Sequence, residues 1–387
     1  MRTIRKQKKV RGLCAALGVA ALGMASSQGA TWYWAGANSN SAAEWETTTN
    51  WNPAGVPGGV ADILLVGNRS GNANVSGIAN ASAGSVSVIR MNASRTVGSI
   101  YAAQANDRNF SIHPGTGGSL TFDNGLGTSN YIVRRDASSN AAVDLAQLRA
   151  GIDVNMVLNS NLVFDVFVKR GYGTSTPTAG STMSNFINSN ISGNGSLTVR
   201  AALLTTTGNA TTNAFYSIEG GSGANTHAGG TIFQKLNPVL GNSSTVTTDV
   251  QSVYRLNKQH ATGDGATTVG AGAIVMVTSL AATGGAINDT TDLNLLFDGV
   301  RRGQMAIATG HNETVARLFL DGVAQAAGTY GATGSGATFI LDDWFTPAIN
   351  AVTGTHLGTL TVLGIPEPGA IALSMLGGLL LFARRRR

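Results

Sequence analysis

The histidines are the first side chains to consider for metal or acid–base chemistry, and their positions do not favour either. They lie far apart, with no ligand spacing among them: His113, His227, His260, His311 and His356. His311-Asn312-Glu313 has the His-x-Glu order of zinc deaminases, but the Pro-Cys-x-x-Cys that completes that zinc site is absent from the sequence. We therefore expect solvated loop histidines, with no metal and no cofactor.

Two short clusters of charged residues remain as catalytic candidates. Asp342-Asp343 stands beside Trp344, and Arg134-Arg135-Asp136 combines both charges. Polysaccharide lyases and hydrolases place such groups on one face, but adjacent residues of a strand point to opposite faces. Nucleophile-elbow, Walker, His-Glu-x-x-His and cysteine-zinc signatures are also absent from the sequence. The sequence predicts a non-enzymatic protein; the alternative is a secreted β-helix lyase or glycosidase.

The positive charge of the chain is concentrated at its two ends. The formal net charge is +6, but ten of the 26 basic residues and one of the 20 acidic residues lie before residue 31 or after residue 364. The segment between carries about −3, so it has no electrostatic attraction for phosphate backbones. We expect no nucleic-acid partner.

Residues 1–30 have the three parts of a secretory signal peptide. A basic stretch to residue 12 precedes the apolar run Leu13–Ala25, and small or polar residues follow to Ala30. Thirteen apolar residues rise only about 20 Å as a helix, which is too short for a bilayer core of about 30 Å. We expect a short signal helix that is removed after export. Cys14, the single cysteine, lies inside this run and is interpreted as apolar filler.

Residues 364–387 combine a proline motif, an apolar segment and a basic cluster. Pro366-Glu367-Pro368 cannot join a helix, because proline lacks the N–H and restricts the residue before it. The fifteen uncharged residues 369–383 predict a marginal transmembrane helix of about 22 Å. Four arginines follow as a membrane stop: Arg384, Arg385, Arg386 and Arg387. Such a cluster belongs on the cytoplasmic side, which places the rest of the chain outside.

This segment resembles the PEP-CTERM sorting signal of Gram-negative bacteria in the order and spacing of its parts. The resemblance implies that an exosortase-type sorting peptidase reads Pro366, Glu367 and Pro368. It also implies a precursor anchored transiently in the inner membrane and a product at the cell surface or outside it. Association with biofilm or extracellular polysaccharide is a further implication.

Residues 31–363 predict a β-rich extracellular body. Short apolar or alternating runs recur between Gly, Asn and Asp residues. The expected strands are Ile63–Val66, Val86–Ile89, Ser119–Phe122, Leu162–Val168, Leu197–Val199, Ile274–Val277, Leu318–Leu320 and Leu360–Leu363. Ala141–Ala150 is the one segment that could form a helix.

Parts of the body resemble proteins with autotransporter-associated β-strand repeats. The N-terminal similarity lies in Trp34, Trp45, Asn50-Trp51, Pro57 and Asp62. The segment Asn225–Thr231 is similar to the repeat's Asn-Thr-x-x-Gly-Gly-Thr turn, and Leu320–Gly331 to its C-terminal block. This chain has no outer-membrane barrel pattern at its end, so the resemblance does not make it an autotransporter.

The expected fold class is mainly β, with a β-solenoid (parallel β-helix-like) body that has Gly and Asn at its corners. At about 25 residues per repeat, stacked about 4.8 Å apart, it would hold about 13 repeats over roughly 60 Å. One or two β-sandwiches are the alternative architecture. Trp32, Trp34, Trp45 and Trp51 are expected to pack in or cap its first repeats, and a carbohydrate-binding platform is the other interpretation.

Overall fold

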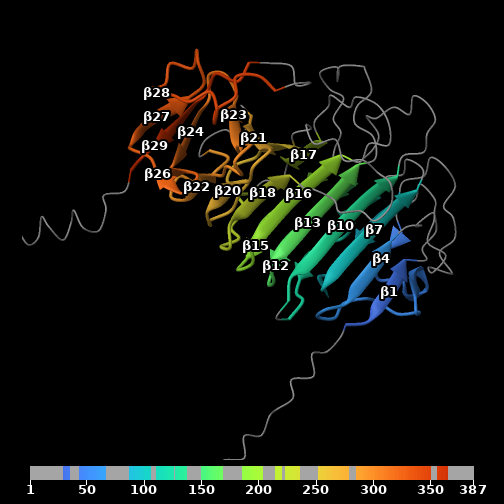
Figure 1. The fold of residues 1–387 in the computed structure, drawn as a ribbon. Helices are drawn as coiled ribbons and strands as arrows, with labels where there is room; N and C mark the ends of the chain where they lie inside the picture. The colour runs from blue at the N-terminus through green and yellow to red at the C-terminus, as the bar shows by residue number, and fades with distance from the viewer. Residues whose placement is uncertain are drawn as a thin grey trace, which may run out of the picture.

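The computed structural model is mainly β (Figure 1). It describes residues 29–34, 43–66, 87–105, 110–125, 127–136, 150–168, 185–203, 214–219, 223–235, 252–278, 285–349 and 355–364. Within these ranges the only helix is the three-residue 3-10 turn η1 (Thr48–Asn50). The expected signal helix and transmembrane helix lie outside the described residues. Of the possible helix Ala141–Ala150 only Ala150 is described, and it begins a strand.

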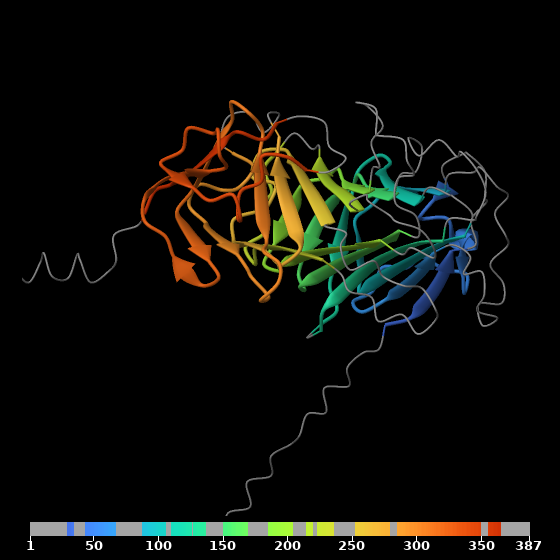
Figure 2. The ribbon, with the colours of Figure 1, turned by 45° about the horizontal axis from the view of Figure 1, so that its top comes forward.

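Twelve strands form the long sheet, which runs through the whole molecule (Figures 1 and 2). The interior strands are parallel to one another, and the strand at each edge is antiparallel to its neighbour. In spatial order the strands are β3 (Trp51–Asn52), β1 (Thr31–Trp34), β4 (Ile63–Val66), β7 (Ser99–Ala105), β10 (Ser129–Asp136), β13 (Leu162–Val168), β16 (Leu197–Leu203), β18 (Thr231–Lys235), β20 (Thr267–Val269), β22 (Asp292–Leu295), β25 (Arg317–Leu320) and β26 (Val323–Ala324).

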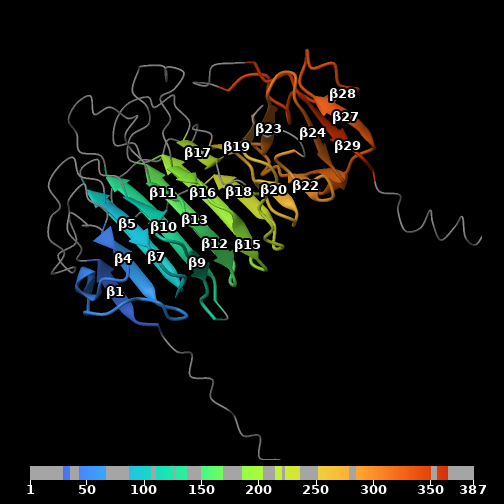
Figure 3. The same ribbon diagram turned by 180° about the vertical axis from the view of Figure 1, so that it is seen from behind.

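Two further sheets are parallel throughout (Figure 3). The second sheet has nine strands: β2 (Ala43–Glu44), β5 (Ser87–Met91), β8 (Phe110–Pro114), β11 (Ala150–Ile152), β14 (Asn185–Ile187), β17 (Ala214–Glu219), β19 (Ser252–Asn257), β21 (Ala273–Val277) and β23 (Gln304–Ile307). The third sheet has four: β6 (Arg95–Val97), β9 (Ser119–Phe122), β12 (Asn155–Leu158) and β15 (Ile191–Gly193).

A mixed four-stranded sheet lies at the C-terminal end. Its strand order is β24 (Asn312–Val315), β29 (Thr359–Val362), β27 (Gly328–Gly331) and β28 (Phe339–Ile340). β29 is parallel to β24 and antiparallel to β27. Figures 1 and 2 both place this sheet at the end of the molecule opposite β1.

The strands form where apolar and polar residues alternate. In β9, Leu120 and Phe122 are fully buried while Ser119 and Thr121 are half-buried. This period of two places one set of side chains in the core and the other outside. All eight strands expected from the sequence are present, with bounds that coincide at β4, β9 and β13 and shift by up to four residues elsewhere.

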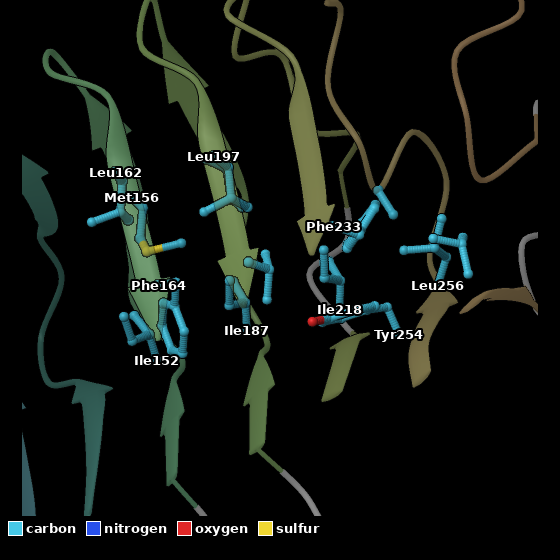
Figure 4. Close-up of a cluster of buried hydrophobic side chains, with 14 of the residues drawn as sticks. Ile152, Met156, Leu162, Phe164, Ile187, Leu197, Ile218, Phe233, Tyr254 and Leu256 are labelled. Atoms are coloured by element: carbon cyan, nitrogen blue, oxygen red, sulfur yellow. The ribbon is translucent and has the colours of Figure 1, made fainter. Parts of the chain in front are cut away.

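Strand register stacks the buried side chains into columns. One column of the long sheet, built from successive register partners, is Leu64, Ile100, Tyr131, Phe164, Val199, Phe233, Val269, Leu295 and Leu320. Every member is buried. Figure 4 shows side chains of the second and third sheets, such as Ile187 and Met156, meeting this column in a continuous core.

The chain visits the sheets in a repeating order. From β7 to β15 it runs through the long, second and third sheets in turn, and each strand pairs with its counterpart one cycle earlier. Paired residues are 31 apart for Ser99 and Asn130 and 35 apart for Asp165 and Arg200, but 25 apart for Asp292 and Arg317. Paired residues are also 25 apart for Arg95 and Leu120, so the expected period of 25 holds near both ends of the described strands but not in the middle. Among the described residues, the long sheet has ten mutually parallel strands.

Turns between the strands use Asn, Ser and Gly in the expected way. The Asn161 side chain accepts a hydrogen bond from the Ser196 N–H one cycle later, and Asn155 accepts from Asn190 N–H. At Gly195 an added Cβ would lie 2.2 Å from the Ser160 carbonyl oxygen, so only glycine fits there. Corner side chains thus tie each cycle to the next.

Antiparallel strands close both edges of the long sheet. β3 covers β1 at one edge, and the hairpin from β25 to β26 closes the other. The hairpin turns at Asp321 (φ 49°) and Gly322 (φ 79°), the left-handed pair that a two-residue hairpin requires. Each end of the sheet is therefore a two-residue strand, which limits further edge pairing.

Candidate functional site

The proposed sorting residues lie outside the described part of the chain. This applies to Pro366, Glu367 and Pro368 and to Arg384, Arg385, Arg386 and Arg387. The last described residue is Gly364, whose N–H donates to the Ala316 carbonyl, and Leu363 N–H donates to Val315. The start of the tail is thus held against the C-terminal sheet. Over the described ranges, no helix has the length and apolarity needed to cross a membrane.

The tandem aspartates occupy a turn rather than a strand. Asp342 accepts from the Thr333 N–H and hydroxyl, both at 2.6 Å, and these bonds lower its pKa. Asp343 is exposed and lies 3.3 Å from Arg302. The expectation of strand geometry was wrong, and the two carboxylates contact different partners.

Trp344 and Arg302 pack together beside Asp343. The Arg302 guanidinium lies 5.3 Å from the Trp344 ring centroid and 4.6 Å from that of Phe297. A cation between two rings covers aromatic surface that a sugar would otherwise stack on. The other cluster, Arg134-Arg135-Asp136, lies at the end of β10, and its side chains are outside the described set.

His227 and His356 are not the solvated loop residues that the sequence indicated, whereas His260 lies in a turn and is half-buried. His227 is fully buried, and its Nε2 lies 2.8 Å from Thr231 Oγ1, whose hydroxyl donates to the Thr262 carbonyl. Burial lowers the pKa of His227 to about 4, so the ring is neutral at pH 7. His356 is also buried, and burial lowers its pKa. His113 lies on β8, with Nδ1 2.6 Å from an Asp153 oxygen.

Glu313 of the His-x-Glu triplet holds a turn in place. It is fully buried and accepts hydrogen bonds from the N–H groups of Ala286 (3.0 Å) and Ile287 (2.9 Å). His311 lies 3.5 Å away. Because the carboxylate accepts hydrogen bonds from two backbone N–H groups, its role is structural and it is poorly suited to proton transfer. The described residues contain no group of three or more side chains arranged to hold a metal ion.

Sequence reasoning missed a buried lysine. Lys258 is 5% exposed, and its Nζ donates to Ser189 O, Asn190 Oδ1 and Asn225 Oδ1 at 2.9, 3.1 and 2.9 Å. All three acceptors are neutral, and burial lowers the pKa of Lys258 to about 8. The only signal of this site in the sequence was the Asn-Thr-x-x-Gly-Gly-Thr turn, which contains its acceptor Asn225.

That turn replaces a strand of the third sheet. After β15, residues 223–230 form no strand, yet Thr226 N–H donates to Ile191 O and Ala228 N–H to Gly193 O. Lys258 donates to the Asn225 side chain, Asn225 donates to the Ala261 carbonyl, and His227 bonds to the Thr231 hydroxyl. The polar network therefore continues the ladder of the third sheet and is structural.

The tryptophans form part of the core, as expected from the sequence. Trp34, Trp45 and Trp51 are buried, and the Trp51 ring centroid lies 4.8 Å from Trp34 and 5.1 Å from Trp45. Trp32 is partly buried, and its indole N–H donates to Asp62. A flat row of exposed rings for carbohydrate is therefore not formed by these four residues.

Asp62 anchors this N-terminal cluster. Its carboxylate accepts four hydrogen bonds: from Ala30 N–H, the Trp32 indole, Gly58 N–H and Gly59 N–H. Its carbonyl accepts two more, from Gly98 and Ser99. The aspartate that the sequence placed in the N-terminal motif joins the first strands of the long sheet to one another.

Comparison with known proteins gave no family model, no curated protein and no solved structure that matches this chain. The roles of the candidate side chains therefore follow from their contacts in this structure. The candidate groups are separated, and those with described side chains are each held by a structural contact.

Proposed function

We propose that this chain is an exported, non-catalytic protein of the cell surface or extracellular matrix, and a substrate of an exosortase-type sorting peptidase. Its body is a β-solenoid, and its tail is a transient inner-membrane anchor. After sorting, the body serves as a structural or adhesive component that associates with extracellular polysaccharide. One observation carries the proposal: Pro366-Glu367-Pro368, fifteen uncharged residues and four arginines follow one another directly after the β body.

The solenoid is supported by the parallel register of the sheets. Strands of the same sheet recur once per cycle, and each pairs with its counterpart in the cycle before. A β-sandwich of the immunoglobulin type would instead pair antiparallel strands. Stacked cycles bury a continuous apolar column that no single cycle could bury alone.

The non-catalytic assignment is supported by how the candidate groups are used. Asp342 binds Thr333, Asp343 pairs with Arg302, and Glu313 binds two backbone N–H groups. A glycosidase needs two carboxylates facing one sugar, about 5 to 10 Å apart. None of these contacts favours the β-helix lyase or glycosidase alternative.

Replacing Pro366, Glu367 and Pro368 together by Ala tests the proposal. The variant should still insert, because the apolar segment 369–383 is intact, but the peptidase should not recognise it. We expect full-length protein to accumulate in the inner membrane of a host that carries the sorting peptidase. Cell fractionation and immunoblotting measure this.

A matched control replaces Gly369 and Ile371 by Ala, next to Ala370. This block has the same length, lies beside the motif and keeps the segment apolar, so it should be processed like wild type. Release of the Pro366–Pro368 variant at the wild-type rate would reduce the motif to a spacer and overturn the sorting proposal.

A further inference from the structure

The end of the molecule from which the tail leaves carries most of its exposed large apolar side chains. We define the end patch as Val323, Ala324, Ala326, Ala327, Phe339, Ile340 and Leu363, all of which are exposed. Val323 is 65% exposed, Leu363 55% and Ile340 44%. Among the described residues, the remaining exposed large apolar side chains are Val60 and Val300.

Close contacts connect the parts of the end patch on β27, β28 and β29. Gly364 packs so closely on Ala327 that a Cβ added to Gly364 would lie 2.8 Å from the Ala327 Cβ. A Cβ added to Gly328 would lie 2.8 Å from the Phe339 ring. Leu363, Ala327 and Phe339 are therefore linked through adjacent residues of β29, β27 and β28. Figures 1 and 2 show these strands together with β26 at the end of the molecule.

The patch is also free of charge along the chain. The segment 322–341 contains no Asp, Glu, Lys, Arg or His, and Asp342 and Asp343 are the only acidic or basic residues between Gly322 and Pro366 apart from His356. The exposed Asp321 lies at the edge of this stretch, directly before Gly322 and Val323. Exposed Val, Ile, Leu and Phe side chains are poorly matched to water. Because no residue of the patch itself is charged, its side chains can enter the interfacial layer of a membrane without desolvation of a charge of their own.

Chain length brings this end to the bilayer. Residues 365–368 separate Gly364 from the apolar segment that begins at Gly369, so the two glycines are at most about 18 Å apart when the chain is extended. The headgroup layer takes up roughly 5 to 8 Å of that distance. Once the tail is inserted, the C-terminal end of the body has no room to move far from the lipid.

We propose that the end patch docks on the lipid surface, so that the anchored precursor stands on the membrane with its N-terminal end outward. This inference rests on the membrane anchoring proposed above. A fixed upright orientation would hold residues 365–368 at the level of the headgroups, where a membrane-embedded peptidase can reach them.

Site-directed labelling of the full chain tests the docking. Cys14 is the only cysteine, so a Cys14→Ser background accepts one environment-sensitive fluorophore at Ala326→Cys in the patch or at Val60→Cys. Val60 is the matched control, because it is an exposed valine near the opposite end, 43% exposed. The proteins are reconstituted in phosphatidylethanolamine/phosphatidylglycerol vesicles that carry a headgroup nitroxide quencher.

We expect quenching at position 326 to exceed that at position 60 by at least about twofold, since an interfacial surface lies within the headgroup layer. Replacing Val323, Ile340 and Leu363 by Asp should remove most of this difference while the protein stays bound to the vesicles. If quenching at position 326 survives the Asp substitutions, the tether alone sets the distance and docking is wrong.

The two proposals fail in different ways. If the protein does not float with vesicles at all, anchoring and docking are both overturned. If it floats but position 326 is quenched no more than position 60, anchoring stands and docking is refuted. Quenching that depends on protein density and is lost on dilution in lipid would assign the patch to a second copy of the chain.

Discussion

At the scale of single residues, the buried polar side chains are the least expected feature of this body. His227, Lys258, Glu313 and Asp62 are all buried and all bond to backbone or neutral partners. A buried polar group without a partner would cost about 1 to 3 kcal/mol, so these hydrogen bonds offset a cost of burial. Asp62 and Glu313 also hold backbone N–H groups of neighbouring turns.

His227 makes stability depend on acidity. Its pKa is about 4 in the folded protein and about 6.5 when unfolded, so the unfolded chain binds the proton more readily. The contribution of His227 is fully present above pH 6.5 and is lost as the pH falls to 4, by about 3 kcal/mol. We expect His227→Gln, whose amide can still donate to Thr231, to flatten this decline. Denaturant unfolding at pH 4.5 and pH 7 measures it, and an unchanged slope in the variant would contradict the assignment.

At the scale of elements, neighbouring strands are linked by charged pairs in register. Arg200 of β16 donates to Asp165 of β13 at 2.6 and 2.7 Å, and Arg317 of β25 donates to Asp292 of β22 at 2.8 and 2.6 Å. Hydrogen bonding to Asp165 raises the pKa of Arg200, and Arg317 responds in the same way to Asp292. The geometry of the two pairs is similar, but their burial differs.

That difference gives a matched test. Arg200→Met leaves Asp165, whose side chain is 6% exposed, without its cation, and we expect a loss of about 2 to 3 kcal/mol. Arg317→Met removes an exposed pair, and solvent screening should make its effect too small to detect. Urea unfolding of the two variants beside wild type measures both. Equal losses of unfolding free energy in the two variants would show that burial does not determine how much each pair stabilises the protein.

At the scale of the whole molecule, the two ends of the body have different surfaces. Near β1 the tryptophans turn inward and Asp62 ties down Ala30, whereas the C-terminal end exposes the end patch. Among the described residues, the contact between Ala30 and Asp62 lies at the end of the predicted signal peptide. Under the proposed function, export and anchoring would involve opposite ends of this body.

We expect the exported protein to lack its first 25 to 30 residues. Cleavage after any of residues 25 to 29 removes the short apolar run and keeps the Ala30 nitrogen that donates to Asp62 at 2.9 Å. Intact-mass measurement of the exported protein locates the cut. Retention of residues 2–12 would refute the signal peptide, and a cut after Ala30 would mean that the Asp62 contact is dispensable.

Much of the fold follows from local sequence pattern. Alternation predicts strands such as Ile63–Val66, Ser119–Phe122 and Leu162–Val168, because a period of two separates the faces of a strand. Gly and Asn mark the turns, since they accept close backbone approach and bond to it. Charge distribution and the proline motif carry the export and sorting predictions, which rest on the sequence alone.

Only the tertiary structure decided the features that depend on contacts between different cycles: the repeat length and the burial of polar side chains. The sequence did not give the repeat length, because paired residues 31 or 35 apart share no local pattern. It misplaced His227, because burial depends on the turn that replaces a third-sheet strand. Lys258 was not recognised because its acceptors at Ser189, Asn190 and Asn225 come from two earlier cycles. Local periodicity determines a strand, but only the stacking of distant cycles decides which side chains it buries.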